Sequence, residues 1–201
     1  MKHFTFASVL AGLLAATPAV LLGGDIEAPV RVPMNCTRGP EDVVFRAVAN
    51  FPESPPSGST FTVRIDSESS GVISHVGLNY IYGMTTVYVV PPGLRYVEGS
   101  ARVIPGTGSV NARPGAHARH QAGRIYLVLP ARIENGSSFT PPSLAFDLLA
   151  EAAPGTRVAL AFAHYEVVAN AFLIGDLHTD CEPVPKPYRI GVLRIDPPVE
   201  P

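Results

Sequence analysis

Charged residues are scarce in this chain of 201 residues, and neither sign of charge dominates. Asp, Glu, Lys and Arg make up 16% of the residues, below the usual quarter, and the formal net charge is −2. The molecule as a whole therefore has no field strong enough to gather nucleic acid, and no nucleic-acid partner is predicted. Low charge does not indicate disorder here, because 46% of the residues are apolar and can form the core of a single domain.

The motifs of nucleotide, metal and hydrolase sites are also missing. The sequence contains no P-loop, no dinucleotide-binding glycine fingerprint, no H-E-x-x-H and no G-x-S-x-G. No cofactor, no metal and no catalytic residue is therefore predicted, and an enzyme is the less favoured reading. The alternative is a secreted enzyme or small-ligand carrier with a pocket between two sheets. In that case His164 and Glu166, which share one face of a predicted strand, would be the first candidates.

The N-terminal segment differs from the rest of the chain. Residues 1–24 read MKHFTFASVLAGLLAATPAVLLGG, with Lys2 followed by an apolar stretch that has no charge before Asp25. This order is typical of a secretory signal peptide, and it predicts a secreted or cell-envelope protein. An uncleaved membrane anchor is the competing interpretation, because the apolar stretch is long. Pro18 and the absence of a following basic cluster favour cleavage, after which no stable membrane span is expected.

Only two cysteines are present, Cys36 and Cys181, and they stand near the two ends of the predicted mature domain. An even number of cysteines in an exported protein usually forms disulfides, so we expect these two to pair. A reactive thiol or a metal ligand is the alternative, but the chain has no C-x-x-C motif to support it.

Apolar residues recur with a period of two, and no segment of the mature chain keeps a helical period. Thr60–Asp66 alternates strictly, and Arg124–Leu129 and Arg157–Ala163 place their large aliphatic or aromatic residues at every second position. With 21 Pro and 18 Gly between such runs, the pattern predicts many short strands. The expected strands cover residues 43–50, 60–66, 75–81, 85–90, 94–103, 124–130, 143–149, 156–168 and 188–195.

These strands predict an all-β protein. One apolar face per strand requires a second sheet to cover it, which leads to an immunoglobulin-like antiparallel β-sandwich of roughly 7–9 strands. We expect a single domain over residues 25–201, with a disordered tail from about residue 196. Residues 144–152, LAFDLLAEA, could instead form a short helix.

The segment VVPPGLRYVEGSARV, residues 89–103, resembles the signature of immunoglobulin-like repeat domains on bacterial cell surfaces. There Pro91 and Pro92 end one strand, Gly93 permits the turn, and Leu94 begins the next strand. The wider pattern of leader, early cysteine, strand-and-turn segments and late cysteine is similar to small exported β-sandwich proteins of actinobacteria. The resemblance implies a sandwich fold and an envelope location, and it supplies no catalytic residues.

Residues 99–133 contain no acidic residue but five arginines and two histidines. A tract of this kind can contact an anionic polymer, a phospholipid headgroup or a sulfated glycan. A solvated loop between strands is the plainer alternative. Metal binding by His117 and His120 is disfavoured by the neighbouring arginine charges. The predicted function is an exported binding or structural module without catalysis, of undetermined oligomeric state. Its candidate binding residues are Arg113, His117, Arg119, His120 and Arg124.

Overall fold

The structure is a computed structural model that describes residues 24–38, 43–109 and 115–199. All regular structure within these ranges is β-structure, so residues 144–152 do not form a helix. The predicted leader lies almost wholly outside the described residues. The described residues form thirteen strands: β1 (Asp25–Cys36), β2 (Val43–Pro52), β3 (Thr60–Ser67), β4 (Leu78–Val89), β5 (Leu94–Tyr96), β6 (Arg102–Val103), β7 (His117–Gln121), β8 (Arg124–Leu129), β9 (Ile133–Glu134), β10 (Leu144–Ala150), β11 (Arg157–Ala171), β12 (Gly175–Pro183) and β13 (Tyr188–Arg194).

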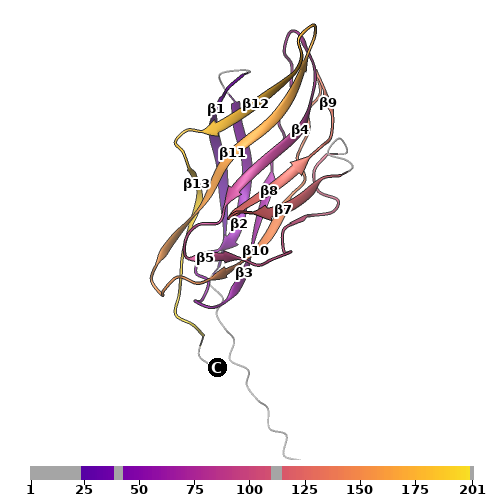
Figure 1. Ribbon diagram of the computed structural model, residues 1–201. Coiled ribbons are helices and arrows are strands. Elements are labelled where there is room, and N and C mark those ends of the chain that lie inside the picture. Colours follow the sequence, from indigo (N-terminus) through magenta and orange to yellow (C-terminus); the bar gives the residue numbers. More distant parts are fainter. Residues whose placement is uncertain (1–23, 39–42, 110–114, 200–201) are drawn as a thin grey trace, which may run out of the picture.

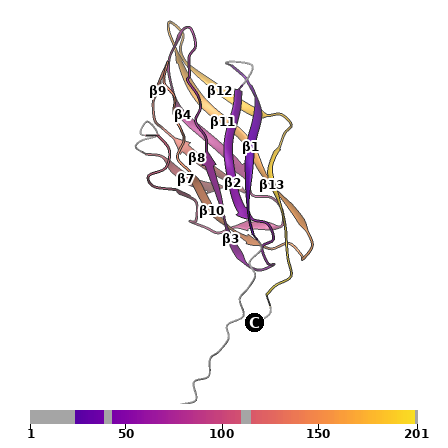
Figure 2. The ribbon, with the colours of Figure 1, turned by 180° about the vertical axis from the view of Figure 1, so that it is seen from behind.

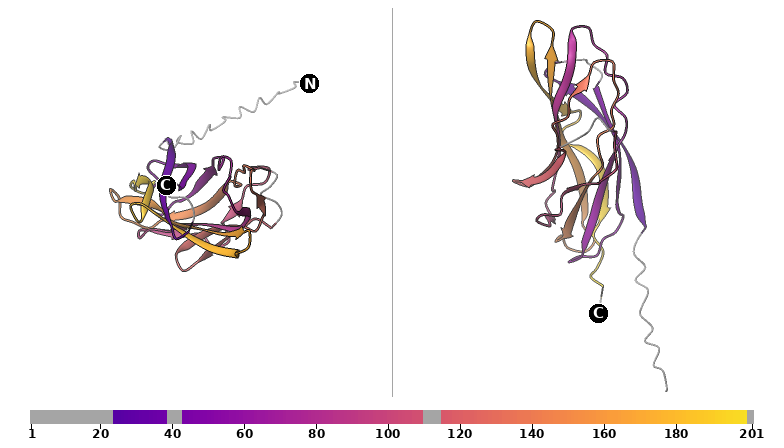
Figure 3. Two further views of the ribbon diagram at one scale, coloured as in Figure 1. Left: turned by 90° about the horizontal axis from the view of Figure 1, so that it is seen from above. Right: turned by 90° about the vertical axis from the view of Figure 1, so that its right-hand side faces the viewer.

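The strands form one continuous antiparallel sheet that curls into two layers, in the order β5-β10-β3-β2-β1-β12-β11-β4-β8-β7. The first five of these strands form one layer, seen from its outer side in Figure 2, and the last five form the other (Figures 1 and 3). Strand β13 pairs with the first half of β11, and β12 pairs with the second half. The predicted all-β antiparallel sandwich is therefore confirmed, with more strands than the 7–9 expected.

The core lies between the two layers and follows the period-two pattern of the sequence. Phe61, Val63 and Ile65 of β3 are buried, as are alternate residues of β8, while β10 is buried except at Asp147 and Leu149. Aromatic rings join the layers at the centre. The ring of Phe162 in β11 stacks on Phe45 at 4.9 Å between centroids, and it meets Tyr88 edge-on at 5.7 Å.

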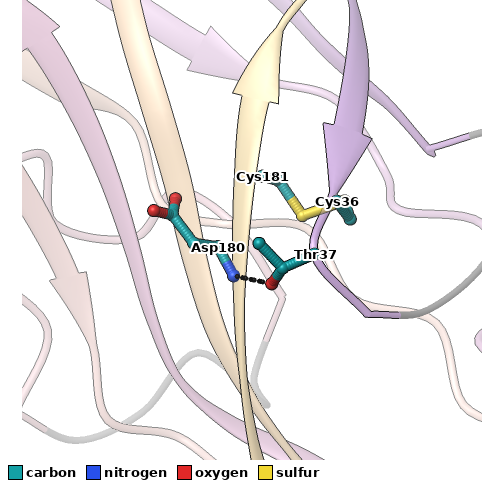
Figure 4. The surroundings of a disulfide bond; sticks show 4 residues. All are labelled: Cys36, Thr37, Asp180 and Cys181. Atoms are coloured by element: carbon teal, nitrogen blue, oxygen red, sulfur yellow. Dashed lines mark hydrogen bonds between the residues drawn. A yellow bond between two sulfur atoms is a disulfide. The ribbon is translucent and has the colours of Figure 1, made fainter.

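The two layers meet at a seam between β1 and β12, where Met34, Asn35 and Cys36 pair with Pro183, Glu182 and Cys181. Cys36 and Cys181 form a disulfide directly across this pairing, which confirms the predicted bond (Figure 4). Thr37 donates its N–H to the carbonyl of Asp180 at 2.9 Å, and its hydroxyl accepts the N–H of Asp180 at 3.1 Å. A covalent bond and hydrogen bonds thus join the layers at one point.

Three strand predictions differ from the structure. The strands expected at 75–81 and 85–90 are one strand, β4, which passes through Gly83 at a positive φ of 60°. The strand expected at 94–103 is divided into β5 and β6. Strands β1, β7, β9 and β12 were not predicted. The turn before β5 is as expected: Gly93 has φ 90°, and its carbonyl accepts the N–H groups of Glu151 and Ala152 at 2.9 and 2.8 Å.

The molecule is elongated and has two distinct ends (Figure 1). At the lower end, called the base here, β1 begins at Asp25 and β13 runs out toward Asp196. Asp196 donates its N–H to the carbonyl of Pro55 at 3.0 Å and forms a bridge with Pro56. At the upper end, called the tip, lie the turn between β11 and β12 and the loop before β4.

Candidate binding surface

Strands β7 and β8 form a hairpin at the outer edge of the second layer. Gln121 pairs with Arg124, so the turn consists of Ala122 and Gly123 alone. Both have positive φ, 49° and 71°, as a two-residue turn of this kind requires. The hairpin places part of the predicted basic tract on a strand, where side chains alternate between the two faces of the sheet.

The alternation separates the predicted binding residues. His117 and Arg119 of β7 and Arg124 of β8 are exposed on the outer face, and these three residues are called the basic edge below. His120 points to the opposite side. Arg113 lies outside the described residues.

The two guanidiniums of the basic edge are not neutralised. The Arg119 guanidinium lies 4.1 Å from the ring centroid of Tyr126, its cross-strand partner, and it also donates to the amide oxygen of Gln121. In the described part of the chain, no carboxylate lies within 4.0 Å of Arg119 or Arg124. The stacked arginine is held in place with its charge still available to an anion.

The rest of the 99–133 tract does not belong to this surface. Arg102 forms an ion pair with Asp147 at 3.4 Å, and Arg132 forms one with Glu134 at 2.6 Å. The basic surface is therefore smaller than the 99–133 tract. The sequence of the tract alone did not show this, because Asp147 comes from β10 and Glu134 directly follows the tract.

His120 closes the side of the sandwich instead of lying on its surface. Its ring stacks on Tyr96 of β5 at 4.1 Å between centroids, and its Nδ1 lies 3.3 Å from a carboxylate oxygen of Glu98. These contacts join the last strand of one layer to the last strand of the other. Its role in the structure is to bridge the open edge of the curled sheet.

The opposite edge of the same layer is acidic, which sequence reasoning missed. Asp176, Asp180 and Glu182 are exposed on one face of β12 together with His178, and Glu182 is ion-paired with Lys186, so Asp176 and Asp180 supply the unneutralised acidic charge. Asp176 accepts hydrogen bonds from the Asn170 amide at 2.7 Å and the Tyr82 hydroxyl at 2.7 Å, which lower the pKa of its carboxyl. One edge of this layer is thus basic and the other acidic. This separation of charge depends on the order of the strands in the sheet, which the sequence does not show directly.

His164 and Glu166, the candidates of the enzyme alternative, lie between these edges on β11. His164 Nε2 is 2.8 Å from Glu166 Oε1. Neither side chain forms a hydrogen bond with a Ser, Thr or Cys of the described residues, so no activated nucleophile is assembled here. Within the same ranges there is no cluster of three metal-ligating side chains, and no helix long and apolar enough to cross a membrane.

Comparison with known proteins identifies the fold. No protein-family model and no curated protein matches the sequence. The chain is similar in structure to a protein from Corynebacterium diphtheriae that is described as membrane anchored, with a TM-score of 0.52, 14% identity and 88% of this chain covered. This chain spans 38% of the length of that protein. At this identity the similarity shows the sandwich fold alone, and the surface-repeat resemblance of residues 89–103 gains no family support.

Two cohesin modules are similar to a lesser degree. One comes from a family 33 glycoside hydrolase of Clostridium perfringens, with a TM-score of 0.40, 11% identity and coverage of 83% of this chain and 98% of the module. The other is the sixth cohesin of scaffoldin B from Acetivibrio cellulolyticus, solved with a dockerin. Its TM-score is 0.34 at 12% identity, with 72% of this chain and 92% of the cohesin covered.

Proposed function

We propose that the chain is an exported, non-catalytic binding module of the cell envelope or the extracellular space, and that its basic edge contacts an anionic polymer or glycan. The observation that carries this proposal is the pair of guanidiniums at Arg119 and Arg124, exposed on one face without a carboxylate partner among the described residues. The disulfide at the seam fits an oxidising, extracytoplasmic location.

The geometry also restricts how such a polymer binds. Arg119 and Arg124 are diagonal neighbours across the β7–β8 pair, which places their Cα atoms roughly 7–8 Å apart. Guanidinium groups bind sulfate, phosphate and carboxylate through two parallel hydrogen bonds. Because the β12 edge of the same layer is acidic, a polyanion is favoured along β7 and β8 and disfavoured across the sheet.

The test is binding of a fluorescent dextran sulfate, measured by anisotropy between 20 and 200 mM NaCl. The variant R119A/R124A is compared with R95A/R102A, which removes two exposed arginines that are already ion-paired, with Glu151 and Asp147. We expect at least a tenfold loss of affinity in the first variant and a change of less than twofold in the control. Equal losses in both variants would show that binding follows net charge and not the basic edge.

The location is tested by fractionating the producing cells and washing the envelope fraction with salt. Attachment through exposed charges weakens as the screening length falls to about 10 Å at 0.1 M salt and below. Release of the wild-type protein by salt, together with its absence from the envelope in R119A/R124A, is the expected result. Protein that appears only in the cytosol would contradict export.

A further inference from the structure

Four large apolar side chains are exposed together at the tip, and these are called the apolar tip. They are Val76 in the loop before β4, and Phe172, Leu173 and Ile174 in the turn between β11 and β12. Phe172, Leu173 and Ile174 are 64%, 91% and 70% exposed, and Val76 is fully exposed. Single exposed apolar residues are ordinary on protein surfaces, but a contiguous group of this kind marks an interaction site.

The two segments of the apolar tip are fixed relative to each other. Phe172 donates its N–H to the carbonyl of Gly77 at 2.7 Å, which links the β11–β12 turn to the neighbouring loop. Asn135 holds that loop from the other side, because its side-chain amide bonds both the N–H and the carbonyl of His75 at 3.1 Å. The four side chains are therefore presented by an ordered framework.

Leu173 adopts a backbone conformation that a leucine does not favour. Its φ is 67°, in the left-handed region, where Gly or Asn would be accommodated with less strain. Packing of its side chain does not offset this strain, since the residue is 91% exposed. A strained leucine that contributes so little to packing indicates that the side chain is kept for a contact outside the domain.

The residues just below the apolar tip suit the boundary between lipid and water. Tyr80 and Tyr82 lie on β4, and the Arg132 guanidinium covers the Tyr80 ring at 3.6 Å from its centroid. Tyrosine and arginine carry an apolar body and a polar end, and they are favoured at membrane interfaces. The Tyr82 hydroxyl donates to Asp176, the first acidic residue below the turn, so the apolar zone ends at that level.

We propose that the apolar tip inserts into the interfacial region of a lipid bilayer, with Tyr80, Tyr82 and Arg132 at the level of the headgroups. A projecting turn whose side chains are carried by two loops offers no flat surface to a protein partner, whereas a bilayer accepts it without a matching shape. The charged groups around it are of both signs, so insertion depends on apolar burial rather than on anionic lipid. Both ends of the described chain lie at the base and leave the tip free.

The test uses a single-tryptophan reporter, since the chain contains no Trp. In the variant F172W, the emission maximum is followed while vesicles of zwitterionic phosphatidylcholine, which carry no net charge, are added at 0.1 and 0.5 M NaCl. We expect a shift to shorter wavelength at both salt concentrations, and quenching that is strongest with lipids brominated near the headgroup end of the acyl chain. Basic-edge binding would instead weaken with salt, which separates the two surfaces.

The decisive variant is L173N in the F172W background, because Asn tolerates the left-handed backbone. We expect partitioning into vesicles to fall about tenfold or more, since a large apolar side chain no longer leaves water, while the melting temperature stays the same or rises. V192N changes an exposed valine on β13 and should bind vesicles as before.

The proposal is overturned if vesicles cause no shift, or if L173N binds as well as its parent. It is equally overturned by a shift that appears without lipid and grows with protein concentration, which would identify a second copy of the chain as the occupant.

Discussion

The base and the tip of this sandwich differ in the solvent exposure of their apolar side chains. At the base, Phe51, Leu193 and Ile195 are almost completely buried between the layers. At the tip, Leu173 and its neighbours are largely exposed, and hydrogen bonds between backbone and side chains hold the loops. Apolar burial thus stabilises the fold chiefly at the base and the centre. The apolar residues of the tip contribute little to stability and are available for binding. Changes at the two ends should separate stability from binding.

The largest effect is expected from removing the disulfide, which joins the layers toward the tip end of the seam. The bond closes a loop with a sequence separation of 145 residues, and a disulfide of this kind contributes about 2–5 kcal/mol. The variant C36A/C181A should lose that much unfolding free energy in guanidinium titrations. An unchanged midpoint would mean that the core of the base alone holds β1 in place.

A smaller loss is expected from adding one methyl group at the base. A Cβ at Gly191 of β13 would lie 2.2 Å from Cζ of Phe51, whose ring is 2% exposed. G191A should therefore destabilise the protein by about 1–3 kcal/mol through overpacking. The neighbouring V192A, at an exposed position, serves as control and should change stability by about 0.5 kcal/mol or less. Equal effects of the two would contradict a tightly packed base.

Substitution of Tyr88 is expected to increase stability. Its ring is buried in the core, its hydroxyl has no hydrogen-bond partner among the described residues, and burial raises the pKa of the phenol above its usual range. Y88F should stabilise the protein by about 1 kcal/mol, because a buried hydroxyl without a partner is lost. Since the pKa is higher in the folded state, the stability of the wild type should fall as pH rises above about 10, the usual value for Tyr. Y88F should lose less stability than wild type over that range in thermal unfolding.

The smallest effect is expected at the β7–β8 turn. Ala122 has φ 49°, a conformation that Asn adopts more readily. A122N should raise the melting temperature slightly, corresponding to about 0.5–1 kcal/mol, and leave binding to dextran sulfate unchanged. A loss of dextran sulfate binding in A122N would show that the turn itself takes part in the basic edge.

Much of the fold could be predicted because its core strands alternate apolar and polar residues over their whole length. β3 and β8 were placed within one residue for this reason, whereas β10 is almost wholly apolar and was predicted with a short helix as the alternative. β1 was missed because Pro29 and Pro33 interrupt its pattern. The structure tolerates them because β1 pairs with β2 along most of its length and with β12 only at Met34–Cys36, so much of its other side needs no donor.

The candidate surface could be predicted only in part, because it depends on pairing between distant strands. His117, Arg119 and Arg124 are close in sequence, so the tract pointed to them. His120 appeared equivalent to these three residues in the sequence. In the structure, the alternation of side chains along β7 places it on the opposite face, against Tyr96. β12 was missed because it is largely polar, and the acidic edge with it. The apolar tip was not predicted, because it lies in the turn between β11 and β12, where no element had been predicted from the sequence.

The disulfide also determines how the domain responds to a mechanical load. A pull applied between Asp25 and Asp196 runs along β1 to Cys36, crosses the sulfur–sulfur bond to Cys181, and returns through β13. Residues 37–180 lie outside this path. Tension can therefore peel away only the two terminal strands, and the extension stops at the covalent bond. The layers that carry the basic edge and the apolar tip remain unloaded for as long as the cysteines stay oxidised.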